Sequence, residues 1–316
     1  MSLRIAIQMD PLESVDINAD TTFALAECAQ ARGHKLWVYQ PEHLSFDTGR
    51  VVARARPAEV QRVKDQPGIL GSETILDLAD DVDVVLMRQD PPFDMAYITA
   101  CHVLELLKGE TLVLNDPEFV RSGPEKLFPL IFPDIIPDTL ISRDLGAIID
   151  FRARHKDIII KPLYGNGGAG VFRMKEDDSN FSSLMEMFLE RTREPLIAQA
   201  FLPAVSNGDK RIILVNGEPV GAINRRPKQG ETRSNLHVGG TAEPVELTDA
   251  DRHICDRIGP ELKRRGQLFV GIDVIGDKLT EVNVTSPTGI QELKRFTGID
   301  AAAIFFDVVQ QMVAKS

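Results

Sequence analysis

The first third of the chain alternates short apolar runs with stretches of helical periodicity. Apolar runs rich in β-branched residues predict strands at Leu3–Met9, Lys35–Tyr39, Val82–Met87 and Thr111–Asn115. Between them, apolar residues at helical spacing predict helices at Asp20–Arg32 and Ala96–Leu107. Strands that alternate with helices predict an open parallel α/β sheet. The polar stretch Ser45–Gly71 interrupts this order, and we expect a hairpin or an excursion over the sheet edge there.

Glycine and proline in Arg121–Pro124 predict a domain boundary, and a short helix, Glu125–Phe132, is expected after it. The middle segment then alternates again. Its predicted helices are Asp144–Arg154 and Asn180–Arg191, and its predicted strands are Ile158–Lys161, Val171–Met174 and Leu196–Gln199.

The last third is richer in strands. Lys210–Val215 and Pro219–Asn224 flank Asn216-Gly217, a strong signal for a two-residue hairpin turn. A long polar loop, Pro227–Pro244, leads to a helix that begins at Thr248. The elements expected after it are strands Phe269–Ile275 and Leu279–Val284 and a final helix, Asp300–Ala314. We therefore expect three domains, at residues 1–122, 123–202 and 203–316.

Composition narrows the class of partner. The chain has 316 residues with 47 acidic and 36 basic side chains, a formal net charge of −11. This negative field argues against nucleic acid or an anionic membrane as partner. The three cysteines are far apart in sequence, which is typical of free thiols in a reducing compartment. No window reaches the roughly 18 apolar residues of a membrane span, and the N-terminus enters a strand directly, so we expect a cytoplasmic protein.

A glycine-rich loop spans residues 161–170, and Gly165, Gly167 and Gly170 match the dinucleotide fingerprint GxGxxG. That fingerprint needs a helix after the loop, whereas Val171–Met174 has the pattern of a strand. We therefore favour a flap between two antiparallel strands over a nicotinamide site. A hairpin without function is also disfavoured, because clustered glycines cost about 0.5–1 kcal/mol each to order. Bare N–H groups closing over phosphates explain them better, with Lys161 supplying a positive charge.

A second constellation lies in the predicted C-terminal hairpin. Glu281 and Asn283 are two apart on a strand and share a face. A two-residue turn at Gly276-Asp277 would place Asp273 on the other face, whereas a three-residue turn would bring all three residues together. A metal site therefore requires the longer turn. Converging carboxylate and amide oxygens suit Mg²⁺, although the same acids could decorate a solvated sheet face.

Several segments resemble the bacterial glutathione synthetases, a family of ATP-grasp enzymes. The resemblance runs from about residue 3 to residue 310 and rests chiefly on the two family-specific segments Met87–Asp94 and Thr280–Thr288. Further matches are Met9–Pro11, Glu125–Phe128, Ile160–Leu163, Gly208–Arg211, Gly217–Val220, Gly230–Arg233 and Phe269–Asp273.

The resemblance implies an α/β domain followed by two ATP-grasp lobes that enclose the nucleotide. It also implies an ATP-dependent carbon–nitrogen ligase. ATP would phosphorylate the C-terminal carboxylate of γ-L-glutamyl-L-cysteine, and glycine would attack the acyl phosphate to give glutathione, ADP and phosphate. Positioning and charge neutralisation dominate such chemistry. A cytoplasmic homo-oligomer, a dimer or a tetramer, is also implied.

Site residues follow from the same resemblance. Those implied for ATP are Lys126, Lys161, Gly165, Gly167, Gly168, Gly170, Asp209 and the adenine hinge Gln199, Ala200, Phe201 and Leu202. Those implied for catalysis are Arg211, Arg225 and Arg233. Asp273, Glu281 and Asn283 would bind two Mg²⁺ or Mn²⁺ ions. Substrate contacts would come from Arg88, Arg233, Asn235, Ser286, Pro287 and Thr288. Residues 227–244 would form a mobile loop that excludes water.

Two departures from the family pattern stand out. Tyr164 occupies a loop position where the family often has aspartate, and the segment between Pro219 and Gln229 is about one residue short. Neither touches the phosphate or metal positions. The alternatives that stay open are an ATP-grasp ligase with a different acceptor and an ATP-binding regulator without catalytic activity.

Overall fold

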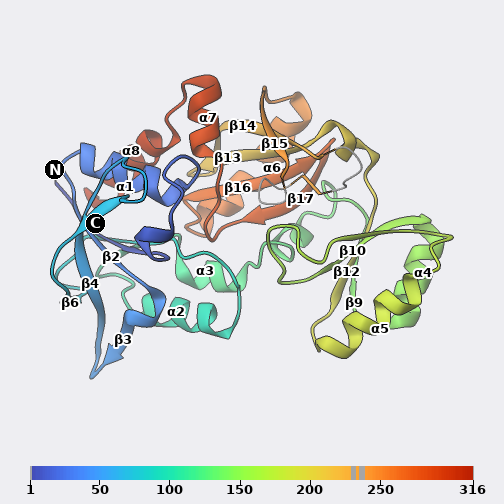
Figure 1. Ribbon diagram of the computed structural model, residues 1–316, viewed down its shortest axis with the longest axis horizontal. Coiled ribbons are helices and arrows are strands. Elements are labelled where there is room, and N and C mark those ends of the chain that lie inside the picture. Colours follow the sequence, from blue (N-terminus) through green and yellow to red (C-terminus); the bar gives the residue numbers. More distant parts are fainter. Residues whose placement is uncertain (1, 229–232, 235–238, 316) are drawn as a thin grey trace.

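The computed structural model describes residues 2–228, 233–234 and 239–315. Three sheets follow one another along an elongated molecule (Figure 1). The N-terminal sheet runs from blue to cyan, the central sheet from green to yellow, and the C-terminal sheet from gold to red. The C-terminal sheet lies between the other two, so residues from all three parts meet near the middle.

The N-terminal sheet has eight strands, with main order β3-β4-β2-β1-β7-β8. Its parallel core is formed by β1 (Arg4–Gln8), β2 (Lys35–Tyr39), β7 (Val84–Met87) and β8 (Leu112–Leu114). The helices that connect it are α1 (Thr21–Ala31), α2 (Met95–Glu105) and α3 (Pro117–Ser122). Asp20 begins α1 by accepting a hydrogen bond from the N–H of Phe23. The predicted open parallel α/β sheet is confirmed.

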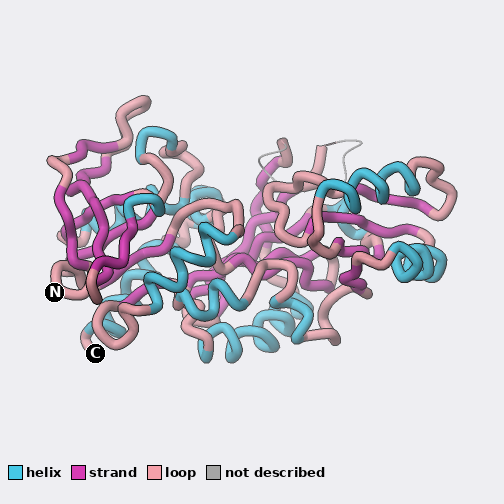
Figure 2. The backbone as a smooth tube through the Cα atoms, turned by 90° about the horizontal axis from the view of Figure 1, so that it is seen from below, coloured by secondary structure: helices cyan, strands magenta, loops and turns pink. Residues whose placement is uncertain are grey.

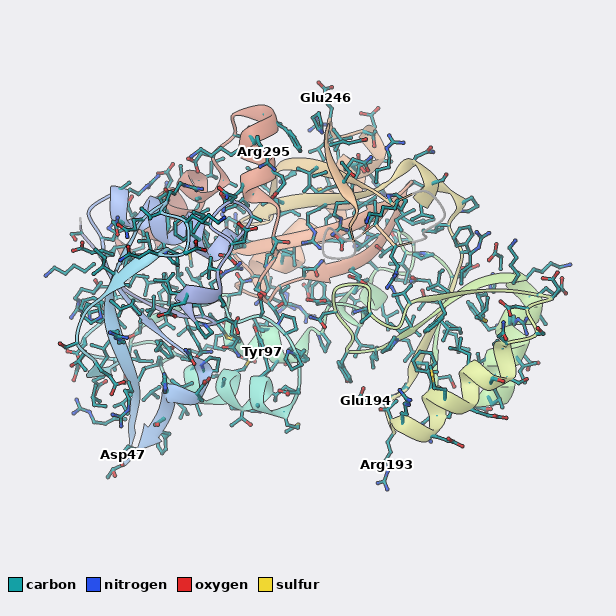
Figure 3. The ribbon with its side chains drawn as sticks, viewed as in Figure 1. Asp47, Tyr97, Arg193, Glu194, Glu246 and Arg295 are labelled. Carbon is teal, nitrogen blue, oxygen red and sulfur yellow. The ribbon has the colours of Figure 1, made fainter. Side chains whose placement is uncertain are left out.

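The polar stretch Ser45–Gly71 is more regular than expected. It forms β3 (Leu44–Asp47), β4 (Arg50–Val60) and β5 (Gly68–Leu70), and β6 (Thr74–Asp77) follows. Because β4 pairs antiparallel with β2, the hairpin extends the parallel sheet at its edge. Asp47 lies at the tip of this hairpin, which projects from the body (Figure 3).

The central sheet has the order β11-β10-β12-β9. Its strands are β9 (Thr139–Ser142), β10 (Asp157–Pro162), β11 (Phe172–Lys175) and β12 (Leu196–Ala200). The helices α4 (Leu145–His155) and α5 (Phe181–Arg191) cover one face, where Phe151, Met185 and Phe188 are buried together with Ile158 and Ile160. On the opposite face, Ile159, Lys161 and Gln199 line a cleft.

The C-terminal sheet is antiparallel, with the order β15-β14-β13-β16-β17. Its strands are β13 (Asp209–Val215), β14 (Glu218–Arg226), β15 (Thr241–Val245), β16 (Phe269–Ile275) and β17 (Lys278–Asn283). Asn216 and Gly217 both have positive φ, as a type I′ turn requires. The helix α6 (Asp249–Arg264) packs its buried residues Ile254, Ile258 and Leu262 on one face. The predicted start at Thr248 is confirmed as a capping box with Asp251.

The chain returns to the N-terminal sheet at its end. After α7 (Ile290–Thr297), the helix α8 (Ala301–Val313) packs beside α1, and Phe305 and Phe306 join the core that contains Phe23. Both chain ends therefore lie at the same end of the molecule (Figure 2). No single helix among the described residues is long and apolar enough to cross a membrane; the bent pair α7–α8 meets that length and composition only when its two helices are counted together.

The predicted helix Glu125–Phe132 is wrong. Only the 3₁₀ turn Phe128–Ile131 forms there, because Pro129 has no N–H to donate to Glu125 O as an α-helix would require. Other short 3₁₀ turns are Leu12–Ser14, Pro41–His43 and Pro203–Asn207. The expected polar loop is shorter than residues 227–244, since β15 begins at Thr241, and part of it lies outside the described residues.

Candidate functional site

The face of the C-terminal sheet that α6 leaves uncovered carries charged residues on four neighbouring strands. Arg225 lies opposite Asp209 across β14 and β13, and Arg211 lies opposite Asp273 across β13 and β16. Asp273 in turn lies opposite Glu281 on β17. Residues directly opposite one another in an antiparallel pair project from the same face. The sheet therefore gathers these side chains, although they are far apart in sequence.

The pairing of Asp273 with Glu281 does not come from the three-residue turn that the metal hypothesis required. The turn is Gly276-Asp277, because Ile275 pairs with Lys278. The register shifts by one residue between Val274 and Asp273, so β17 contains a bulge. This bulge restores the convergence that a regular two-residue hairpin would have prevented.

Arginines neutralise the carboxylates of this face. Arg211 binds Asp273 through Nε and Nη2, at 2.5 and 2.9 Å from the two carboxylate oxygens. Arg225 bridges Asp273 and Asp209, with its Nη2 at 3.0 and 2.5 Å from their oxygens. Burial opposes ionisation of Asp273, but the two guanidinium groups hold its pKa below the usual value. Burial raises the pKa of Asp209 to about 6 against the pull of Arg225.

Two buried lysines face Glu281. Lys161 Nζ is 3.5 Å and Lys126 Nζ is 3.8 Å from the same carboxylate oxygen. Burial lowers the pKa of Lys161, while the pKa of Glu281 is held down, against its burial, by Lys126 and Lys161. In this charged corner, two ammonium and two guanidinium groups outnumber the carboxylates of Asp209, Asp273 and Glu281 by one, and this small excess of positive charge suits a polyphosphate.

The glycine-rich loop lies over this corner. It joins β10 to β11, which pair antiparallel, so the expected flap is confirmed and no helix follows the GxGxxG motif. Gly167, Gly168 and Gly170 have φ values of +60°, +81° and +71°, which other residues rarely adopt. The loop is anchored from outside, because Gly165 O accepts a hydrogen bond from Lys126 and Gly168 O accepts one from Arg233 at 3.4 Å.

A cleft of about 880 Å³ separates the central sheet from the C-terminal sheet. Its walls include the apolar side chains of Ile159, Val171, Leu202 and Ile275 as well as Lys126, Lys161, Asp273 and Glu281 of the charged corner. The four hinge residues, Gln199, Ala200, Phe201 and Leu202, also line it. The N–H groups of Ala200 and Phe201 already donate to carbonyls within the protein, so Leu202 is the better candidate for contacting a base.

A second, wider cleft of about 2160 Å³ continues from the first. Asn166, Gly167 and Glu281 line both. Its floor is the segment Thr285–Thr288, whose carbonyl oxygens accept hydrogen bonds from arginines. Arg88 donates to Thr285 O at 3.4 Å and to Pro287 O at 3.2 Å, and Arg211 donates to Thr288 O at 3.4 Å. The Ser286 hydroxyl donates to Asp90 at 2.8 Å.

Nearly all of the site residues inferred from the sequence line one of the two clefts; Gly170 lines neither, and Asn235 lies outside the described residues. Sequence reasoning missed Glu125, which lines the second cleft and whose pKa is raised to about 7 by burial and by the charge of Glu281. It also missed the carboxylates Asp10, Asp16 and Asp20 on the N-terminal rim of that cleft. The motif Met9–Pro11 matches the family, but its residues alone do not predict that Asp10 lines a cleft.

The donor chemistry of the hairpin fits a magnesium ion. Among the described residues no three His, Cys, Asp or Glu side chains gather as a metal cluster, so the protein itself supplies few ligands. Asp273 and Glu281 carry carboxylate oxygens, which a cation would share with Arg211 and with the two lysines. Asn283 Nδ2 donates to Gly271 O at 3.1 Å, which leaves its amide oxygen for a cation. Such a sparse oxygen set is typical of Mg²⁺ sites completed by phosphates.

Family models match almost the whole chain. The model of the prokaryotic glutathione synthetase N-terminal domain matches residues 3–121, and that of the prokaryotic glutathione synthetase ATP-grasp domain matches residues 125–298. A glutathione synthetase from Brucella melitensis is 55% identical over 310 residues, covering 98% of this chain and 99% of that protein. One from Salmonella typhimurium is 42% identical over 315 residues, covering 99% and 100%.

Solved structures share the fold at low identity. A D-cycloserine synthetase superposes with a TM-score of 0.69 at 15% identity, covering 98% of this chain and 99% of that one. A RimK domain ATP-grasp protein from Sphaerobacter thermophilus gives 0.64 at 17% identity, covering 96% and 98%. At this identity the solved structures show that the fold is shared and say nothing about the substrate.

Proposed function

The chain belongs to the prokaryotic glutathione synthetase family, and we propose that it joins γ-L-glutamyl-L-cysteine to glycine with cleavage of ATP to ADP and phosphate. The observation that carries this proposal is the continuity of the two clefts at Glu281, Asn166 and Gly167. A nucleotide in the first cleft would present its terminal phosphate where a carboxylate in the second could reach it.

The first cleft divides according to the chemistry of ATP. The base would lie between apolar side chains near Leu202, and the phosphates would lie beneath the glycine-rich loop beside Lys126 and Lys161, all of which line this cleft. These lysines offset charge repulsion as a substrate carboxylate oxygen attacks the terminal phosphorus and the bond to ADP breaks. Arg211 and Arg225 border the second cleft and stabilise the charge on the transferring group.

Asp273, Glu281 and Asn283 would hold Mg²⁺ or Mn²⁺, and two ions are consistent with three oxygen-bearing side chains shared with phosphates. When bound, the metal neutralises phosphate charge and orients the phosphates. The protein's own residues fix its position, because Asp273 is aligned by Arg211 and Arg225.

The second cleft then holds the dipeptide and the acceptor amine. Phosphorylation converts the dipeptide carboxylate, a poor electrophile, into an acyl phosphate. The glycine nitrogen attacks the carbonyl carbon, the bond to phosphate breaks and the nitrogen loses a proton. We propose that the substrates are contacted by Arg88, Arg233, Asn235 and the segment Ser286–Thr288.

The test is a stoichiometric assay. Purified protein with γ-glutamylcysteine, glycine, ATP and Mg²⁺ should release phosphate in a one-to-one ratio with glutathione. ATP turnover without glutathione, together with turnover on another amine, would identify a ligase with a different acceptor. ATP binding without any turnover in a folded protein would indicate a regulator and overturn the proposal.

We further propose that the protein is cytoplasmic and forms a homo-oligomer, a dimer or a tetramer. Each chain would consist of three domains, at residues 1–122, 123–202 and 203–316. Light scattering coupled to gel filtration measures the oligomeric state directly, and a monomeric mass would contradict it.

A further inference from the structure

The glycine-rich loop touches the N-terminal part of the protein through an aromatic pair. The ring of Tyr164 stacks on Phe93, with centroids 6.2 Å apart and planes inclined by 24°. Stacked rings at this separation attract one another. Neither the phosphate nor the metal assignment uses Tyr164.

Phe93 is held firmly on its own side. It packs against Tyr97 of α2, with centroids 5.2 Å apart, and Tyr97 is buried in the core. Figure 3 labels Tyr97 near the middle of the molecule, between the N-terminal and central sheets. Pro91 and Pro92 precede Phe93 and fix two consecutive φ angles. The ring of Phe93 is therefore stiffly connected to Asp90.

Asp90 belongs to the second cleft. Asp90 and Pro91 line that cleft, and Asp90 accepts a hydrogen bond from the Ser286 hydroxyl at 2.8 Å. Its own N–H donates to Asp10 at 2.8 Å. A ligand that contacts this wall thus contacts the segment that carries Phe93.

The other ring of the pair belongs to Tyr164, in the glycine-rich loop that lies over the first cleft. Tyr164 is followed by Gly165, whose carbonyl is held by Lys126, and by Asn166 and Gly167, which line both clefts. Glycines restrain the backbone weakly. A side-chain contact at Tyr164, directly before the first glycine of the loop, therefore restrains where the loop lies.

We propose that Tyr164 is a positioning residue: its stack on Phe93 couples occupancy of the second cleft to placement of the glycine-rich loop over the ATP phosphates. The inference rests on the proposed function, because it takes the ligand of the second cleft to be the dipeptide. Coupling of this kind is reciprocal, so each ligand tightens binding of the other by the same factor.

The experiment measures that factor by calorimetry. The affinity for a non-hydrolysable ATP analogue with Mg²⁺ is determined with and without saturating γ-glutamylcysteine, in wild type, Tyr164→Ala, Phe93→Leu, the double variant and Tyr164→Phe. In wild type the dipeptide should tighten analogue binding. Tyr164→Ala should reduce the factor by about two- to tenfold, the range expected for an aromatic pair. Tyr164→Phe keeps the ring and should retain the factor.

The double variant should lose no more coupling than Tyr164→Ala alone, because both changes remove one contact. Full coupling in Tyr164→Ala, additive losses in the double variant or a wild-type factor of one would each overturn the inference. Because these binding measurements involve no turnover, they test the role of Tyr164 independently of the glutathione assay. A wild type that makes no glutathione refutes the proposed function whatever the variants show.

Discussion

Asp273 lies directly opposite Glu281 across β16 and β17, although the turn that joins these strands is only two residues long. A bulge in β17 supplies the missing residue, and the Thr280 hydroxyl donates to Asp273 O at 3.0 Å beside it. Bulges often redirect side chains next to active sites. Here the bulge determines whether three oxygen-bearing side chains face the phosphate cleft.

Asn283 gives the sharpest test of the metal assignment. Asn283→Ala removes the amide oxygen and should lower kcat at least tenfold while raising the Mg²⁺ concentration needed for half activity. Asn283→Asp keeps an oxygen ligand and should recover much of the activity. Initial rates across a Mg²⁺ titration measure both effects.

Asp277→Asn is the matched control, because Asp277 is exposed in the turn of the same hairpin. It should behave as wild type. Asn283→Ala also removes the Nδ2 hydrogen bonds to Gly271 O at 3.1 Å and to Asp273 at 3.5 Å, which should cost about 1–3 kcal/mol of stability. An Asn283→Ala protein with wild-type Mg²⁺ dependence would show that the hairpin does not bind the ion.

Arg225 and Arg226 are neighbours in sequence that should differ sharply in their effect on stability. Arg225 is buried between Asp209 and Asp273, so Arg225→Met should cost about 3–5 kcal/mol by leaving the buried Asp209 without a cation and Asp273 with Arg211 alone. Arg226 makes an exposed ion pair with Glu243, and Arg226→Met should cost about 0–1 kcal/mol. Urea unfolding measures both, and equal losses would refute the burial argument.

The sequence predicted those parts of the fold that depend on local patterns. The Asn216-Gly217 turn and the capping box at Thr248 follow from rules that need only a few adjacent residues. The β17 bulge does not, because register is decided by packing against β16 and α6. Glu125 was missed for a similar reason, since its importance comes from burial beside Glu281, more than 150 residues away in sequence.

Cysteine reactivity tests the packing of the core. Cys101 and Cys255 are buried, and burial raises the pKa of each thiol to about 12. At pH 8 only about one such thiol in 10,000 is ionised. Burial also raises the pKa of Cys28, but this thiol is only partly covered. In the native protein Ellman's reagent should label Cys28 first and slowly, and urea should expose all three; rapid labelling of Cys101 would contradict the structure.

Glu125 should make stability fall as pH rises. Burial, with the charge of Glu281, raises its pKa from 4.5 to about 7. Between those values the folded state binds more protons than the unfolded chain, so the free energy of unfolding decreases as pH increases through that window. A gap of this size corresponds to a change of about 3 kcal/mol.

Glu125→Gln removes the titration and keeps a side-chain oxygen that can accept from the Thr285 hydroxyl, now 3.2 Å from the carboxylate. Its advantage over wild type should therefore be small at pH 5 and grow by pH 8, measured by urea unfolding in EDTA. Glu110→Gln, at an exposed glutamate, should run parallel to wild type across the range. If Glu125→Gln also ran parallel to wild type, Glu125 would be ionised in the folded protein throughout, and the desolvation argument for the second cleft would fail with it.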